Sequence, residues 1–307
     1  MKVVLVNIGV FQEYILYCIK QLQNYGNNDI TIITNSEFFD KYIVLENTEN
    51  IELVPSEELD DMNYHLFSGM SRDFRDGFAF YTSQRLFLIY SYMKYYGIKD
   101  CVHIENDNMI YENLDAIFPG SPVSINVCAV FDSPKKVIAS IIYIPSIYAL
   151  EELLKQYNMG LNDMENLGMR ADAIEKLPII PLIKDYTEPN YTIGIPYAQN
   201  FGRFGKKHIF DGAAIGQYFG GIDPRNTTEK NTRGFINETC VVKFNNFNFT
   251  WLDSDEDGLY RPYLIVNGDE YPIVNLHIHS KKLSEFYCDF TTSSTPQNFD
   301  FTTSSTP

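Results

Sequence analysis

The chain has 307 residues, of which 45% are hydrophobic and 15% aromatic, and its formal net charge is −16. This composition excludes a disordered chain, which would lack the apolar and aromatic residues needed to build a core. The negative charge disfavours nucleic acid and anionic membrane surfaces as partners, because both are themselves negative. A nucleoside diphosphate stays compatible, since a bound metal ion neutralises phosphates locally.

Cysteine use and hydropathy bear on the compartment. The five cysteines are scattered without a CxxC pair, which argues against a disulfide framework and favours a reducing compartment. The first residues enter a strand-like run and lack the pattern of a secretory signal. The most apolar later stretch, Val137–Leu150, is too short to span a bilayer and contains Pro145. We expect a cytoplasmic protein with no membrane span, and the sequence gives no oligomeric state.

The first residues predict a strand, a helix and a second strand. Lys2–Val6 is a continuous apolar run, typical of a buried parallel strand. Phe11–Tyr25 places apolar residues at helical spacing and is followed by a stop signal at Gly26. Ile30–Ile33 is the next strand. Such a βαβ order predicts a parallel sheet with helices packed on it.

The next elements continue the alternation. A short strand is predicted at Ile51–Val54 and a strong helix at Thr82–Tyr96, capped by its first threonine or by the serine that follows. Gly97 ends this helix, and Cys101–Glu105 is the following strand. The remaining predicted elements are strands at Val123–Val130 and Val137–Ile144, helices at Ile147–Tyr157 and Phe210–Phe219, short strands within Tyr260–Asn275, and a final strand at Val274–Ile278.

The end of the chain differs from the rest. The octapeptide DFTTSSTP occurs at Asp289–Pro296 and again at Asp300–Pro307. A polar repeat of this kind cannot bury enough surface to fold alone. We therefore separate a low-complexity tail, 289–307, from one folded α/β domain with a central, mostly parallel mixed sheet flanked by helices.

An acidic motif follows directly on the strand at Cys101–Glu105. Glu105 and Asp107 are spaced i, i+2 at the carboxyl end of a strand, where open α/β sheets bind their ligands. Such a carboxylate pair suits a hard divalent cation such as Mg²⁺ or Mn²⁺. An acidic turn is the alternative interpretation, because Asn and Asp favour turns.

A second cluster, His277, His279 and Lys281, lies late in a chain that has only five histidines. Two histidines at i and i+2 on a strand point to the same face. Imidazoles beside a lysine suit a metal ion together with a phosphate. The pattern does not choose between the two histidines, and a zinc site made only of protein ligands is the competing interpretation.

These motifs carry a family resemblance. Arg85–Tyr111 resembles the stretch around the DXD motif in glycosyltransferases of the GT-A fold, where an arginine on a helix precedes a strand and the acidic motif. The first acid here is Glu105 instead of Asp, so Asp107 is the surer metal ligand. The histidine–lysine cluster is similar to the element that completes the metal site and grips the pyrophosphate in several GT-A families. The order of parts covers residues 1–285, but three short motifs carry it.

The resemblance implies a single GT-A-like, Rossmann-like domain over residues 1–288, with a nucleotide-sugar-binding half (1–115) and an acceptor-side half (116–288). It implies transfer of a sugar from a nucleoside diphosphate sugar, with UDP favoured, to a glycan or other hydroxyl acceptor, aided by Mn²⁺ or Mg²⁺. The expected metal ligands are Asp107, His277 and His279, and the expected donor contacts are Asn7, Gly9, Arg85, Glu105 and Lys281.

Phe210–Asn226 resembles the acceptor-side helix of GT-A enzymes, in which an acid at the helix start serves as base or holds the acceptor. By that resemblance Asp211 is the first catalytic candidate and Asp223 the second. The structural alternatives are a helix N-cap for Asp211 and a turn for Asp223.

The loop after the first strand, which contains Asn7 and Gly9, lies where a donor base and ribose would bind, but it lacks GxGxxG. A dinucleotide-binding fold is therefore not supported. Two other functional classes stay open. One is a zinc hydrolase that uses His277 and His279, and the other is a non-catalytic sugar-binding module.

Overall fold

The computed structural model describes residues 1–45, 50–59, 70–118, 125–133, 136–178, 208–221, 223, 225, 248–253, 258–266 and 268–288. The predicted tail, 289–307, lies outside them. The strands are β1 (Val3–Asn7), β2 (Ile30–Thr34), β3 (Ile51–Pro55), β4 (Cys101–Ile104), β5 (Asn108–Ile110), β6 (Val127–Ser133), β7 (Lys136–Ile144), β8 (Ile174–Lys176), β9 (Asn248–Asp253), β10 (Tyr260–Val266), β11 (Asp269–Pro272) and β12 (Asn275–His277). The helices are α1 (Ile15–Asn24), α2 (Ser56–Leu59), α4 (Phe78–Tyr96), α5 (Leu114–Ile117), α6 (Ile147–Leu154), α7 (Asp163–Met169) and α9 (Ala214–Gly220), and 3₁₀ turns are η1 (Ser36–Tyr42), η3 (Phe74–Gly77), η4 (Ala171–Ala173) and η8 (Leu283–Phe286).

The central sheet has seven strands in the order β3-β2-β1-β4-β7-β6-β8. The first four run parallel to one another. β7 is antiparallel to both β4 and β6, and β8 runs parallel to β6. Every residue of β1 and β2 is buried, as expected for strands that are covered on both faces. The predicted α/β domain with a mostly parallel mixed sheet is therefore confirmed.

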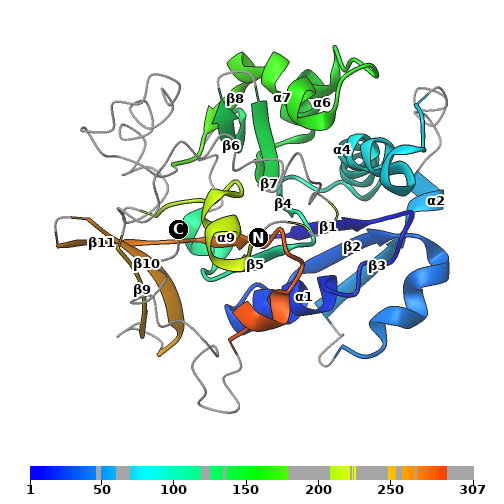
Figure 1. The fold of residues 1–307 in the computed structure, drawn as a ribbon. Helices are drawn as coiled ribbons and strands as arrows, with labels where there is room; N and C mark the ends of the chain where they lie inside the picture. The colour runs from blue at the N-terminus through cyan, green and yellow to red at the C-terminus, as the bar shows by residue number, and fades with distance from the viewer. Residues whose placement is uncertain are drawn as a thin grey trace.

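Helices cover both faces of this sheet. In Figure 1, α4, α6 and α7 lie on one side, and α1 lies on the other. α1 buries Ile15, Cys18, Ile19 and Leu22, so the apolar stripe that predicted this helix is the face that packs. No helix in the described ranges is long and apolar enough to cross a membrane.

The predicted start of α4 is wrong by one turn. The helix begins at Phe78, after Gly77 in a left-handed conformation, and neither Thr82 nor Ser83 caps it. The Thr82 hydroxyl instead donates to the carbonyl of Ala79 within the helix. The apolar residues Phe78 and Phe80 extend the helix without a capping signal, which is why the sequence pattern missed its first turn.

The other predicted helices are present but shorter than expected. The helix predicted at Phe11–Tyr25 is α1, that at Ile147–Tyr157 is α6, and that at Phe210–Phe219 is α9. α6 starts where Ser146 Oγ accepts the N–H of Ala149. The strand predicted at Val123–Val130 is displaced to β6, and β5 and β9 are strands that the sequence pattern did not predict.

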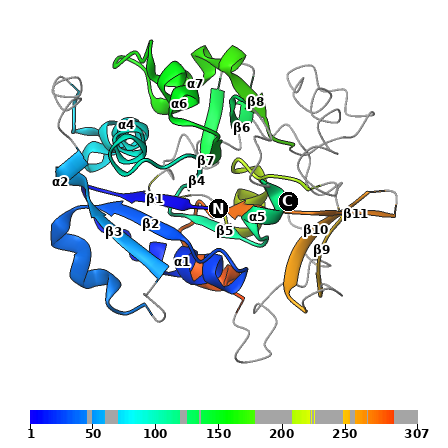
Figure 2. The same ribbon diagram turned by 180° about the vertical axis from the view of Figure 1, so that it is seen from behind.

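Two small sheets complete the domain. β12 pairs antiparallel with β5, so His277 lies opposite Asn108. β9, β10 and β11 form an antiparallel sheet, which lies on the side of the molecule away from α2 and α4 in both views (Figures 1 and 2). The β5–β12 pair places β12 and the turn that follows it beside the acidic motif after β4.

The burial of the central sheet gives a stability prediction. Replacing Ile32, which is fully buried in β2, by Ala should lower the free energy of unfolding by about 2–5 kcal/mol through lost apolar burial and a residual cavity. Ile43→Ala is the matched control, since that side chain is 73% exposed, and it should change stability by less than about 0.5 kcal/mol. Urea unfolding followed by circular dichroism measures both, and equal losses in the two variants would contradict the assigned core.

Candidate functional site

A pocket of about 530 Å³ lies at the carboxyl ends of β1 and β4. Its walls come from the loop after β1, the N-terminal half of α4, β7, and the turn after β12, and its lining includes Glu105, Asp107, His277, His279 and Lys281. This is the edge of the sheet at which open α/β folds bind ligands. The two motifs predicted from distant parts of the sequence therefore meet in one pocket.

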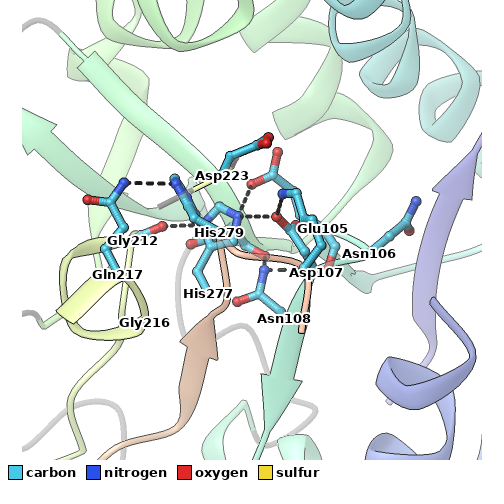
Figure 3. Close-up of polar contacts among 12 residues, drawn as sticks. Glu105, Asn106, Asp107, Asn108, Gly212, Gly216, Gln217, Asp223, His277 and His279 are labelled. Atoms are coloured by element: carbon cyan, nitrogen blue, oxygen red, sulfur yellow. Dashed lines mark hydrogen bonds and ion pairs between the residues drawn. The ribbon is translucent and has the colours of Figure 1, made fainter. Parts of the chain in front are cut away.

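Within the described residues, Glu105, Asp107 and His277 form the one group of side chains with metal-ligand spacing, and their ligand atoms lie within 4.8 Å of one another. His277 Nε2 is 3.1 Å from Asp107 Oδ2 and 3.4 Å from Glu105 Oε2. Figure 3 shows the imidazole and the two carboxylates turned toward one another. The group offers two hard oxygen ligands and one nitrogen, a set that suits Mg²⁺ or Mn²⁺.

The charges of this cluster depend on one another. Burial alone would raise the pKa of Asp107, but the positive His277 and Lys281 outweigh it and hold that pKa well below its usual range. Burial would lower the pKa of His277, but Asp107 and Glu105 raise it to about 9. The protein itself therefore supplies the positive charge that this carboxylate pair requires, and a divalent cation can take that role.

Lys281 lies at the mouth of the same cluster. Its ammonium contacts Asp107 Oδ2 and lies 5.6 Å from the centre of the Tyr14 ring. Its backbone is left-handed, with φ 64°, which is uncommon for a residue other than glycine. Such strain is found where a side chain must be presented in one direction, as at ligand sites.

The two histidines have different surroundings. His277 Nδ1 donates to the carbonyl of Gly212, which leaves Nε2 facing the carboxylates once the ring is neutral. His279 Nδ1 instead lies 2.9 Å from Gln217 Nε2, and burial together with His277 holds the pKa of His279 well below its usual value. The two rings contact each other edge to face at 4.4 Å. The geometry thus makes His277 the better candidate for a metal ligand, and His279 lies beside it as a neutral neighbour.

Arg85 bridges two carboxylates. Its guanidinium contacts Glu105 Oε1 on one side and Asp163 Oδ2 on the other. Burial would lower the pKa of Arg85, but these two partners raise it. Arg85 also lines the pocket, and its ion pair holds Glu105 in place. The longer side chain of Glu105 lets one oxygen meet Arg85 while the other faces His277.

The two acidic candidates from the acceptor side have different positions. Asp223 lines the pocket, where Arg225 contacts both of its carboxylate oxygens. Asp211 is 1% exposed, and its carboxylate accepts the backbone N–H groups of Ile215 and Gly216. Asp211 is not among the residues that line the pocket. Its oxygens therefore face backbone donors and not the pocket.

Asn7 and Gly9 also lie beside the pocket instead of on its wall, which Ile8 and Val10 form. The side-chain amide of Asn7 donates to the hydroxyl of Tyr42. Gly9 has φ 80°, and a Cβ at this position would lie 2.2 Å from the Tyr81 ring. The loop after β1 thus lines the pocket through Ile8 and Val10, while Asn7 and Gly9 support the loop from outside the pocket.

Several pocket residues carried no recognised signal in the sequence: Tyr14, Arg75, Asp163 and Arg225. Asp163 is the first residue of α7 and Arg75 belongs to η3, and neither stands in a motif. Arg75 has φ 49°, Asp76 has φ 56° and Gly77 has φ 89°, so this turn before α4 is left-handed at three residues in succession. These side chains can be recognised as pocket residues only from the three-dimensional structure, which brings them together.

No protein-family model matches the chain, and no curated protein sequence matches it. Among solved structures, it is similar to the galactosyltransferase LgtC in complex with donor and acceptor sugar analogues, with 12% identity, 62% of this chain and 81% of that chain covered, and TM-score 0.44. It is similar to xyloside xylosyltransferase 1 of mouse, with 8% identity, coverage of 58% and 86%, and TM-score 0.39. A cytidylyltransferase from Leptospira borgpetersenii gives 11% identity, coverage of 58% and 74%, and TM-score 0.37. Function therefore has to follow from the site residues.

The protonation state of His277 gives a prediction for metal binding. Below its pKa of about 9 the ring carries a proton on Nε2, and this proton must leave before that nitrogen can bind a cation. At pH 7.5, Mn²⁺ binding should release about one proton, and the apparent affinity should rise about tenfold per pH unit until it levels near pH 9. Calorimetry in two buffers of different ionisation enthalpy measures the proton count. A count near zero would contradict His277 as a ligand.

Proposed function

We propose that this chain is a metal-dependent glycosyltransferase that takes its sugar from a nucleoside diphosphate sugar, with UDP the favoured nucleotide, and passes it to a hydroxyl acceptor. The observation that carries the proposal is the convergence of Glu105, Asp107, His277 and Lys281 in one pocket at the carboxyl ends of parallel strands. The two carboxylates with one imidazole suit a hard cation, and the lysine beside them suits a phosphate.

The chain's own residues divide the work as follows. Asp107, His277 and Glu105 hold the cation, which would supply charge stabilisation to the leaving diphosphate. Lys281 reaches Asp107 from the turn after β12. When a diphosphate enters, the ammonium can turn from Asp107 to a phosphate oxygen, so the leaving group meets a second positive charge.

For the acceptor side we propose Asp223 over Asp211. Asp223 lines the pocket, and burial, which would raise its pKa, is outweighed by Arg225, so the carboxyl stays ionised at neutral pH. An ionised acid at the wall can orient an acceptor hydroxyl or accept its proton. Asp211 lacks this access, because its oxygens accept backbone hydrogen bonds.

The site supports this proposal better than a zinc hydrolase. A hydrolase built on His277 and His279 would need both imidazoles on the metal, whereas His279 is held by Gln217 and lies outside the cluster of ligand atoms. Two carboxylates with one imidazole also form a harder ligand set than the histidine-rich sets of catalytic zinc sites.

The direct test is removal of the central carboxylate. Asp107→Asn keeps the size of the side chain but removes a charged ligand, so sugar transfer and slow hydrolysis of the UDP-sugar should fall about 100-fold or more. The measurement is UDP released from a panel of UDP-sugars with Mn²⁺ present. Circular dichroism and urea unfolding show whether the variant keeps the fold.

Asp115→Asn is the matched control. Asp115 is also an aspartate with an ion-pair partner, the N-terminal ammonium, but its side chain is 65% exposed and it does not line the pocket. This variant should keep the wild-type rate. A folded Asp107→Asn variant that transfers sugar as fast as the Asp115→Asn control would remove the basis of the proposal.

A further inference from the structure

We infer that Asp211 is a positioning residue, which fixes the backbone of His277 and thereby the metal site without contacting the substrate. The inference rests on the proposed function only in that His277 is taken as a metal ligand. It follows from which backbone N–H groups donate to the Asp211 carboxylate and from the contacts that hold Asp211 and His277 in place.

The carboxylate of Asp211 gathers three backbone donors from two separate parts of the chain. Oδ1 accepts the N–H of Ile215 at 3.0 Å, and Oδ2 accepts the N–H of Gly216 at 2.8 Å. Oδ2 also accepts the N–H of His277 at 3.0 Å. The first turn of α9 has N–H groups without partners inside the helix. One buried carboxylate therefore joins the start of α9 to the strand that carries the metal ligand.

The hydrogen bond from the N–H of His277 to Asp211 holds the backbone of His277 on its second side. Successive N–H groups along a strand point to opposite sides. The N–H of Ile278 donates to the carbonyl of Asp107 on one side at 2.8 Å, and the N–H of His277 donates to Asp211 on the other. The backbone at His277 is thus held between the residue that supplies the first ligand and the carboxylate of Asp211.

The ring of His277 is held by the same segment. The carbonyl of Gly212, the residue after Asp211, accepts from Nδ1 and so fixes both the tautomer and the ring plane. Figure 3 shows this contact on the side of the ring opposite the two carboxylates. Residues 211 and 212 therefore set the backbone and the side chain of one ligand together.

Gly216 shows how closely helix α9 approaches the backbone of His277. A Cβ at this position would lie 2.1 Å from the carbonyl oxygen of His277, closer than any side chain allows. Helix α9 can therefore rest directly on the backbone of His277 because it has no side chain there. The close contact between α9 and the backbone of His277 therefore requires a glycine at position 216, independently of the Asp211 carboxylate.

The position of Asp211 itself is also fixed from outside. Its N–H donates to Asn275 Oδ1, and its carbonyl accepts from Asn275 Nδ2 and from Ser140 Oγ. Asn275 Nδ2 also donates to Asn108 Oδ1 in the paired strand. Asp211 is thus hydrogen-bonded to side chains on β7 and β12, and through Asn275 to β5. It can therefore hold the backbone of His277 in a fixed position.

The test measures metal binding in the absence of any substrate. Mn²⁺ is titrated calorimetrically into the full metal-free chain, for the wild type, Asp211→Asn and Gly216→Ala. Loss of the residues that orient a ligand typically weakens metal binding about 10- to 100-fold, and we expect this range for both variants. Gly216→Ala tests whether the backbone position of His277 controls Mn²⁺ affinity even if Asp211→Asn does not fold, because it moves His277 while it keeps the carboxylate.

Ser146→Ala is the matched control. It also removes a side-chain oxygen that accepts a helix N–H, at the start of α6, so it lowers stability without touching the site. Its Mn²⁺ affinity should equal that of the wild type. An Asp211→Asn variant that binds Mn²⁺ like the wild type but has lost transfer would overturn the inference and make Asp211 catalytic. A wild-type chain that binds no Mn²⁺ would instead overturn the metal site, and the inference with it.

Discussion

Two carboxylates held side by side after β4, Asp107 buried and Glu105 partly buried, are the constraint on which the rest of the site depends. Glu105 and Asp107 repel each other, and both are largely withdrawn from water, so neither can stay ionised without a nearby positive charge. The chain supplies that charge from three directions: Arg85 on α4, His277 on β12 and Lys281 in the turn that follows. A divalent cation can replace the proton on His277 and the ammonium beside Asp107, so the same arrangement is suited to a metal ion and a phosphate.

The pairing of β5 with β12 makes this arrangement possible. It brings a segment near residue 277 against a segment near residue 107, and it directs successive backbone bonds to Asp107 on one side and Asp211 on the other. The candidate ligand His277 thus lies on β12, and Glu105 and Asp107 lie in the short turn that joins β4 to β5. A ligand set held by regular structure keeps its geometry before the metal and the donor arrive, which lowers the cost of organising the site.

Much of this could be predicted from sequence, because local patterns carry it. The continuous apolar run at β1 and the stripe on α1 predicted the parallel sheet, and the position of Asp107 after a strand predicted its place at the sheet edge. Asp163 and Gln217 could not be predicted, since each acquires its partner only through tertiary packing. Asp211 could be predicted only as one of two alternatives, a helix N-cap or a catalytic acid, because it precedes a helix. The structure favours the first role, since its carboxylate accepts backbone N–H groups.

The most direct measurement of the central claim is a calorimetric titration of UDP into the wild-type chain, first with saturating Mn²⁺ and then with EDTA. If Asp107, His277 and Glu105 hold a cation that meets the diphosphate beside Lys281, UDP binds with Mn²⁺, and its affinity falls at least about tenfold in EDTA, the equivalent of about 1.4 kcal/mol. Equal affinity in both conditions would contradict a metal bridge between these residues and the nucleotide. Absence of binding to UDP, and to GDP, dTDP and CMP after it, would contradict the use of a nucleotide donor.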